Sequence, residues 1–272
     1  MKLFITGATG FIGYNLTKFY KDCDLKLYGR GQNLQQELEH FGPDAIINSA
    51  AEIYQADLMW ESNVLLTRQC VEYVKDHSDC KMIQIGSSSE YGPLPRASKE
   101  TDCINPIDMY QTTKGISTIL CQGYARTLNL AISVIRPYSV YGPGEKPHRL
   151  FPKLYKAFCY NEPMQLRDGV HDFIYIDDFI QCVDLVMQQM QPGQGHIINA
   201  GSGYEYTNYQ VLKIFEQQTG RSAPVEYIPG FAKNFESQTW RCDTEYAREK
   251  YGFQVQFTLN QGIAKFLETA QY

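Results

Sequence analysis

Tyrosine–lysine pairs are the first feature of this sequence that could carry out chemistry. Several tyrosines stand four residues before a lysine, among them those of the pairs Tyr14/Lys18, Tyr110/Lys114 and Tyr246/Lys250. On a helix this spacing places both side chains on one face. An ammonium favours the ionised form of a nearby phenol, so such a pair can exchange protons with an alcohol or a carbonyl compound. The spacing also arises by chance, so the surrounding sequence has to identify the reactive pair.

The context favours Tyr110/Lys114. This pair begins a helix predicted near residues 106–129, downstream of KMIQIGSSSEYG, whose buried strand ends at the serine run 87–89. The carboxyl ends of parallel strands border the ligand crevice of an open α/β sheet, so these hydroxyls are expected beside a bound cofactor. We predict that Ser87 polarises a substrate oxygen, that Tyr110 exchanges the proton and that Lys114 supports the phenol. The alternative is a packed aromatic ring next to ordinary loop hydroxyls.

A glycine-rich turn near the start of the chain predicts the cofactor site. The stretch GATGFIG follows the strand-like KLFIT directly and opens an amphipathic helix, where backbone N–H groups can hold a pyrophosphate. Gly7 suits the tight turn, Gly10 the close approach of phosphate and Gly13 the packing of helix on strand. The alternative is a turn with a structural role alone. The predicted cofactor contacts in this stretch are Gly7, Thr9, Gly10, Phe11, Ile12 and Gly13.

The second strand bears on the choice of cofactor. An NAD site usually places an acidic residue at the end of this strand, to bond the ribose 2′-hydroxyl. Here the strand ends in LKLYGRG, so that Gly29 stands at the acidic position and Arg30 follows with a guanidinium suited to a 2′-phosphate. We predict NADP, with NAD as the alternative, and expect Asn33 and Leu34 to complete this part of the site. Arg30 as an ordinary surface charge is the other interpretation.

Strands and helices alternate along the first half of the chain, which predicts an α/β fold with a doubly wound parallel sheet of the Rossmann type. Buried strands are expected at 2–6, 25–28, 44–50, 81–86 and 131–136, and helices near 11–20, 33–41, 58–77 and 106–129. After Pro137 the pattern loosens into a smaller interleaved C-terminal lobe. Its expected helices lie near 148–160, 177–190, 207–219 and 258–270, with strands near 172–176, 196–199 and 225–228. We divide the chain into a dinucleotide-binding domain (1–141 and 173–203) and a substrate-binding lobe (142–172 and 204–272).

Composition narrows the classes of partner. The 272 residues carry a net charge of −5, and we find no basic patch of the kind that binds nucleic acid. No apolar run approaches the roughly 18 residues that would span a bilayer, and the start of the chain does not have the pattern of a secretory signal. The eight cysteines are widely spread without metal-binding spacing, so we expect them to be reduced and expect no metal. These features predict a cytoplasmic protein whose partner is a small molecule.

Taken together, the motifs resemble the extended short-chain dehydrogenase/reductases, which include nucleotide-sugar epimerases, 4,6-dehydratases, decarboxylases and ketoreductases. The resemblance covers nearly the whole chain and rests on GATGFIG, PDAIINSAA, ESNV, IGSSSEYG, YQTTK, IRPYSVYGPG, DFIYIDD and NAGSG. It implies that Ser87 is the catalytic serine, four residues before the motif tyrosine Tyr91. Further cofactor-lining positions are implied at Asn48, Ala50, Ala51, Asn63, Pro137 and Tyr138.

The chain also departs from the family pattern. Dehydratases and decarboxylases often have an acidic residue two before the motif tyrosine, but here that residue is Ser89, and the acid is Glu90. We expect neighbouring side chains of an extended turn to point opposite ways, which would turn Glu90 from the substrate. His171 replaces the arginine that usually precedes DF, and Ser139 replaces an asparagine. The predicted substrate contacts are Ser88, Ser89, Ser139, Arg167, His171 and Arg241. The alternative interpretation is that the two arginines are surface charges and that His171 is a turn residue.

Three functions fit these residues. The favoured prediction is NADPH-dependent reduction of a nucleotide-linked 4-keto sugar, because the stretch GSSSEYG resembles the pattern of such reductases. The alternative is a nucleotide-sugar epimerase or 4,6-dehydratase that keeps NAD bound. A regulatory protein that only binds the cofactor would not need Ser87, Tyr110 and Lys114. A homodimer through the long helices near 58–77 and 106–129 is expected from the resemblance.

Overall fold

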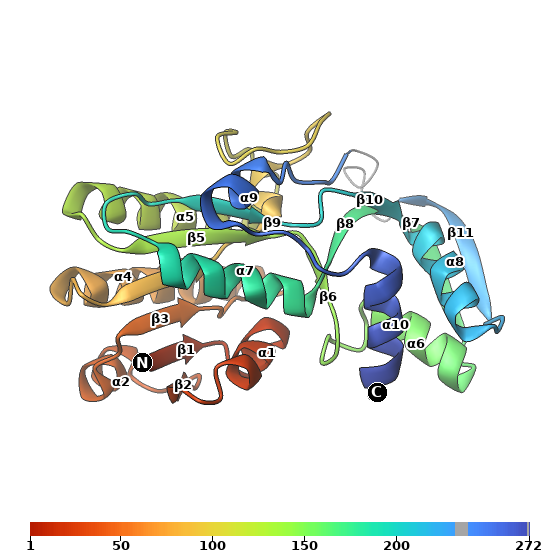
Figure 1. Cartoon of the computed structure of the whole chain (residues 1–272), viewed down its shortest axis with the longest axis horizontal. Helices are drawn as coiled ribbons and strands as arrows, with labels where there is room; N and C mark the ends of the chain where they lie inside the picture. The colour runs from red at the N-terminus through yellow and green to blue at the C-terminus, as the bar shows by residue number, and fades with distance from the viewer. Residues whose placement is uncertain (232–238, 271) are drawn as a thin grey trace.

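A six-stranded parallel sheet forms the centre of the molecule (Figure 1). The computed structural model describes residues 1–231, 239–270 and 272. The strand order is β2-β1-β3-β4-β5-β9: the chain adds β2 on one side of β1 and the later strands on the other side. This change of side is typical of a dinucleotide-binding sheet. The strands are β1 (Lys2–Thr6), β2 (Asp24–Tyr28), β3 (Ala45–Asn48), β4 (Lys81–Ile85), β5 (Ile132–Pro137) and β9 (Ile197–Ala200).

Helices cover both faces of this sheet, because its strands are apolar on both sides. Alternate side chains of β1 divide between two cores: Leu3 and Ile5 pack in one, Phe4 in the other. Helices on the first face are α1 (Phe11–Phe19) and α7 (Ile176–Gln189), with α9 (Glu245–Tyr251) beside β9. Those on the second are α2 (Leu34–Phe41), α4 (Leu66–Asp76) and α5 (Met109–Leu128). The predicted fold class is confirmed.

The remaining elements gather at one end of the molecule (Figure 1). A three-stranded sheet has the order β10-β8-β6, and β11 pairs in parallel with β7. These strands are β6 (Ser139–Tyr141), β7 (Met164–Asp168), β8 (Val170–Tyr175), β10 (Glu205–Thr207) and β11 (Val225–Phe231). The accompanying helices are α6 (Leu150–Tyr160), α8 (Asn208–Thr219) and α10 (Leu259–Thr269).

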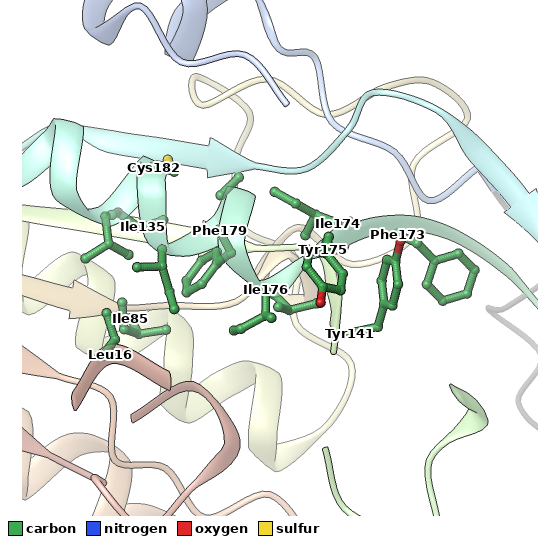
Figure 2. Close-up of a cluster of buried hydrophobic side chains, with 14 of the residues drawn as sticks. Leu16, Ile85, Ile135, Tyr141, Phe173, Ile174, Tyr175, Ile176, Phe179 and Cys182 are labelled. Atoms are coloured by element: carbon green, nitrogen blue, oxygen red, sulfur yellow. The ribbon is translucent and has the colours of Figure 1, made fainter. Parts of the chain in front are cut away.

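One continuous hydrophobic core joins this end of the molecule to the central sheet. Figure 2 shows its side chains, which run from Leu16 of α1 through Phe179 of α7 to Tyr141 and Phe173. The Tyr141 ring stacks on Phe151 at a centroid distance of 4.0 Å. Because β8 leads directly into α7, a single segment contributes to both ends of the core. The shared core and this shared segment therefore fix the position of the smaller lobe relative to the central sheet.

The helix predicted near 58–77 is divided into three parts. α3 (Ala56–Met59) leads into a π-helical turn, η1 (Trp60–Leu65), and then into α4. The carbonyl of Asn63 accepts hydrogen bonds from the hydroxyls of Thr67 and Ser117, at 2.7 and 2.6 Å. π-helical turns of this kind arise where other groups form hydrogen bonds with the backbone carbonyls of a helix.

The other expected elements are present, with ends that differ by a few residues. The short strands β6, β7 and β10 were not predicted, because three to five residues give too little periodicity. Ser88–Tyr91 forms a 3₁₀ turn, η2, where an extended turn was expected. Among the described residues, no helix is both long and apolar enough to cross a membrane.

The turn between β1 and α1 has no room for side chains at two glycines. Gly7 has φ +68°, and a Cβ added there would lie 2.6 Å from the backbone nitrogen of Ala50. At Gly13 an added Cβ would lie 2.1 Å from the carbonyl oxygen of Gly7. The start of α1 can therefore rest directly on the end of β1 only with glycine at these positions.

We expect Gly13→Ala to lower the free energy of unfolding by about 1–3 kcal/mol, because the helix must move away from the Gly7 carbonyl. The matched control is Gly123→Ala in α5, where an added Cβ meets nothing within 4 Å. There alanine should raise stability by about 0.5–1 kcal/mol. Urea denaturation followed by circular dichroism measures both, and equal stability of the two variants would contradict the predicted clash.

Candidate active site

The glycine turn fits a dinucleotide at the carboxyl end of β1. Gly10 is the N-cap of α1 and has no side chain over the first helical N–H groups, which suits a bound pyrophosphate. Thr9 is exposed on this turn, whereas Phe11 and Ile12 are partly buried against the core. Glycine at positions 7 and 13 lets this turn pack directly on neighbouring backbone, which is the tight strand–turn–helix geometry of a dinucleotide site.

Arg30 lies just beyond β2, with its side chain 79% exposed and Nη2 3.7 Å from Oε2 of Glu52. Sequence reasoning missed Glu52, which follows β3 and is buried. The hydrogen bond from the Tyr54 N–H, with those from Gln55 and Ile53 and the charge of Arg30, lowers the pKa of Glu52. Arg30 therefore already faces a carboxylate at the position where a 2′-phosphate would bind.

Two residues predicted beside Arg30 have structural contacts. The Asn33 side chain caps α2 by accepting the Gln36 N–H at 3.2 Å, and Leu34 is buried in the second core. Both residues could still contact a cofactor. The helix cap and the core packing are, however, sufficient reasons for asparagine and leucine at these positions.

The predicted catalytic residues converge where β4 ends. Ser87 is the N-cap of η2, and its hydroxyl lies 2.7 Å from the hydroxyl of Ser89. Tyr110 is in the first turn of α5, which Asp108 caps by accepting the Gln111 N–H. Burial raises the pKa of Tyr110 above its usual value, and a hydrogen bond with Ser87 offsets part of this rise. The structure therefore brings the phenol and the serine hydroxyl together.

Lys114 lies one turn further along α5 and is only 2% exposed. Its Nζ donates a hydrogen bond to the Ile85 carbonyl at 2.5 Å. Burial lowers the pKa of Lys114 to about 8, partly offset by the charge of Glu90. An ammonium that loses its proton this close to neutrality can respond to the ionisation of its neighbours.

Glu90 lies beneath these residues, fully buried and paired with Arg136 of β5. Its Oε1 accepts the Ser87 N–H at 2.8 Å, and its Oε2 accepts from Nε and Nη2 of Arg136, both at 2.8 Å. The guanidinium also lies over the Tyr91 ring, 4.2 Å from its centroid. The extended turn predicted here was wrong: a 3₁₀ turn directs Glu90 inward, where both its oxygens have partners.

Two asparagines expected to line the cofactor are fully buried and act through hydrogen bonds. Asn63 accepts the Glu52 N–H at 2.8 Å and donates to the Thr113 hydroxyl at 3.0 Å, so it joins the loop after β3 to α5. Asn48 bonds the side chains of Thr6, Thr67 and Gln84. Ala50 and Ala51 retain some exposure, as does Pro137, while Tyr138 is buried with its hydroxyl on Ser98.

A cavity of about 230 Å³ is lined by residues of β6, of the loop before α6, and of α6, β8 and α8. Two predicted substrate contacts, Ser139 and His171, line it. Burial lowers the pKa of His171 to about 4, so this imidazole is neutral at physiological pH. Ser88 is buried within η2, and Ser89 is half-buried. Arg167 and Arg241 are exposed and do not line the cavity, as far as the described residues show.

Sequence reasoning missed several polar residues of this cavity, among them Glu145, Arg149 and Asn208. The first two lie in a glycine- and proline-rich stretch without periodicity, and Asn208 begins α8, so no pattern marked them. The charge of Arg149 offsets a small part of the rise that burial causes in the pKa of Tyr110. In the part of the chain that the structure describes, no cluster of three metal-binding side chains occurs.

Comparison with known proteins gives consistent matches. A model of the NAD dependent epimerase/dehydratase family matches residues 3–201. UDP-glucuronate 4-epimerase of Thermodesulfobacterium geofontis is 28% identical, over 86% of this chain and 74% of that protein. The structure of dTDP-glucose 4,6-dehydratase of Bacillus anthracis in complex with NAD has a TM-score of 0.88 and 20% identity, covering 98% of this chain and 96% of that one. For UDP-glucuronic acid 4-epimerase of Bacillus cereus, in complex with UDP-glucuronic acid and NAD, the values are 0.86 and 23%, with 98% of each chain covered.

We expect Arg136→Met to lower the free energy of unfolding by about 3–5 kcal/mol, because the buried Glu90 carboxyl loses its cation. The control is Arg68→Met, which removes the exposed Arg68–Glu72 pair and should change stability far less. Urea denaturation of both variants tests this. Similar losses in the two variants would show that the buried pair has no special role in the fold.

Proposed function

The chain belongs to the NAD dependent epimerase/dehydratase family, and on this premise we propose that it is an NAD-dependent nucleotide-sugar epimerase. The observation that carries the proposal is the meeting of Tyr110 and Ser87 at the carboxyl end of β4, at the same edge of the parallel sheet as the glycine turn. The relatives support the substrate class, since their names include UDP-glucuronate and UDP-glucose epimerases.

The chain's own residues have distinct tasks in this proposal. The glycine turn and the neighbouring Ala50 backbone would hold the cofactor, whose nicotinamide, when bound, exchanges hydride with a sugar carbon. Tyr110 takes the proton of the sugar hydroxyl as that carbon is oxidised and returns a proton when it is reduced. Ser87 bonds the same oxygen and fixes its position. The buried Lys114 ammonium stabilises the phenolate and would bond the nicotinamide ribose.

Epimerisation is preferred to dehydration because of the serine run. Loss of water needs an acid beside the sugar, but residues 87–89 carry hydroxyls only. The one carboxyl in η2 belongs to Glu90, whose oxygens are occupied by Ser87 and Arg136. An epimerase needs proton exchange at one oxygen, which Tyr110 and Ser87 can provide.

NADPH-dependent reduction of a 4-keto sugar is the second candidate. It is favoured by Gly29 and Arg30 at the end of β2, where no acidic residue stands to bond a ribose hydroxyl. Against it stands Glu52, whose carboxylate lies 3.7 Å from the guanidinium and would repel a 2′-phosphate. This neighbour is the reason why NAD takes precedence in the proposal.

The proposal also covers the roles of the two domains, the oligomeric state and the cellular compartment. Residues 1–141 and 173–203 bind the cofactor, and residues 142–172 and 204–272 bind the nucleotide sugar. A homodimer is supported by exposed apolar side chains on neighbouring helices, among them Leu58, Trp60 and Ile119. The eight cysteines have no disulfide in the structure, which suits a reducing cytoplasm.

Tyr110→Phe should reduce turnover by about 10²–10⁴-fold and leave cofactor affinity nearly unchanged, because only the exchangeable proton is lost. The control is Tyr246→Phe, which removes the hydroxyl of another tyrosine that precedes a lysine by four and bonds His196 in the structure. Chromatography of UDP-, GDP-, CDP- and dTDP-sugars incubated with NAD measures conversion. Full activity of Tyr110→Phe would rule out the catalytic assignment.

The nicotinamide that copurifies with the chain distinguishes the two candidates, and the epimerase proposal expects NAD. In the same proposal, Arg30→Ala leaves NAD affinity within about twofold, whereas Glu52→Gln tightens NADP binding by removing the repelling charge. Fluorescence titration with both reduced cofactors measures these affinities. Copurified NADP together with a large loss of NADPH affinity in Arg30→Ala would favour the reductase.

A further inference from the structure

Glu145 is a buried carboxyl with one unused oxygen. It lies in the loop between β6 and α6 and is 6% exposed. Its Oε1 accepts a hydrogen bond from Nε of Arg149 at 3.2 Å, whereas Oε2 has no partner among the residues that the structure describes. A buried oxygen without a partner is costly, unless a ligand bonds to it.

Glu145 lines the cavity formed by β6, α6, β8 and α8. Asn208, across the cavity, also has an unpartnered buried oxygen within the described structure, and its amide nitrogen is held by the Arg167 carbonyl at 3.1 Å. Two separate elements therefore present unsatisfied oxygens to this cavity, which is also lined by Arg149, whose side chain is 53% exposed. A ligand here meets one cation and two groups able to bond donors.

Arg149 is the charged group that acts most directly on Glu145. The titratable groups near it are Lys146 and His148 of its own loop, Arg149 of α6, Tyr141 of β6, His171 of β8 and Tyr272 at the C-terminal end. Lys146 lies over the Tyr54 ring, 5.0 Å from its centroid. Burial, with nearby positive charge, lowers the pKa of both histidines. Burial raises the pKa of Glu145 to about 7, although Arg149 acts to lower it.

We propose that Glu145 takes up one proton when the diphosphate of a nucleotide sugar binds to Arg149, so that substrate binding is linked to pH. The inference rests on the proposed substrate class. An ionised Glu145 occupies Arg149 and repels an incoming anion. After protonation the carboxyl releases the guanidinium, and its new O–H can donate to a phosphate oxygen. The proton comes from solvent, and no covalent bond between heavy atoms changes.

The direction of the pH dependence follows from linkage. The bound anion stabilises the protonated carboxyl, so Glu145 has a higher pKa in the complex than in the free protein. Below the free pKa of about 7 the carboxyl is already protonated, and affinity is constant. Above it, affinity falls by about tenfold per pH unit until the pKa of the complex is reached.

Isothermal titration calorimetry with UDP-glucose, GDP-mannose, CDP-glucose and dTDP-glucose, in the presence of NAD, tests the proposal. A diphosphate esterified at both ends has no ionisation near neutral pH, so any proton uptake belongs to the protein. Titrations in two buffers of different ionisation enthalpy, between about pH 6 and pH 9, give the number of protons taken up. We expect uptake that approaches one proton per bound nucleotide sugar above the free pKa.

Glu145→Gln keeps the shape of the side chain and mimics its protonated form. This variant should bind without proton uptake and with an affinity that stays constant as the pH rises. The matched control is Glu72→Gln, which removes the carboxylate of another i,i+4 glutamate–arginine pair, on the surface of α4. The control should keep the wild-type pH dependence.

The outcomes separate this inference from the proposed function. Binding of a nucleotide sugar by the wild type without proton uptake, or with an uptake that Glu145→Gln retains, overturns the role of Glu145 and leaves the substrate class intact. Failure of all four nucleotide sugars to bind at about pH 6 overturns both.

Discussion

The buried ion pair between Glu90 and Arg136 is the interaction on which the active site depends. Two ends of neighbouring strands, β4 and β5, are joined by charges that have no access to water. Removing a charge from water is costly, so the pair favours the one arrangement that keeps both Glu90 oxygens and the Nε and Nη2 of Arg136 bonded. Because the carboxylate also accepts the Ser87 N–H, that arrangement fixes the start of η2 and with it the Ser87 hydroxyl, to which we assign the catalytic role.

Lys114 is a third buried charged residue, next to Glu90 and Arg136. Together these three residues explain why the site can be rigid while one of its groups still titrates near neutral pH. The ammonium is held by the Ile85 carbonyl and not by a carboxylate, so burial lowers its pKa towards neutrality. Glu90 opposes that shift at a distance while its own oxygens stay bonded elsewhere. The phenol of Tyr110 thus lies among groups whose positions are fixed and whose protonation can still respond.

Much of this arrangement could be predicted from the sequence, because its causes are local. Apolar runs alternate with amphipathic stretches, and the parallel sheet follows from that pattern. Gly7 and Gly13 stand where a side chain would collide with backbone, so their spacing marks the turn. Ser87, Tyr110 and Lys114 were predicted because strand ends and helix turns place them predictably.

The rest depends on contacts between distant parts of the chain, which no local pattern records. Glu52 follows a strand and looks like a surface residue, but Asn63 and the N–H groups of residues 53–55 hold it beside Arg30. Glu145 lies in a loop rich in glycine and proline, and its burial arises only when β6, α6 and the C-terminal end pack around it. In the same way, the inward direction of Glu90 required the 3₁₀ turn.

Glu90 and Glu145 show how the number of partners divides buried carboxyls into two kinds. Both are buried beside an arginine, and burial raises the pKa of both. Glu90 has every oxygen bonded to a fully buried guanidinium and a backbone N–H, so any change in its charge would leave these groups unpaired. Glu145 has one free oxygen, a half-exposed guanidinium and a cavity next to it. The first arrangement favours a single state, whereas the second leaves room for a ligand to change the state, and this difference assigns structure to one carboxyl and substrate response to the other.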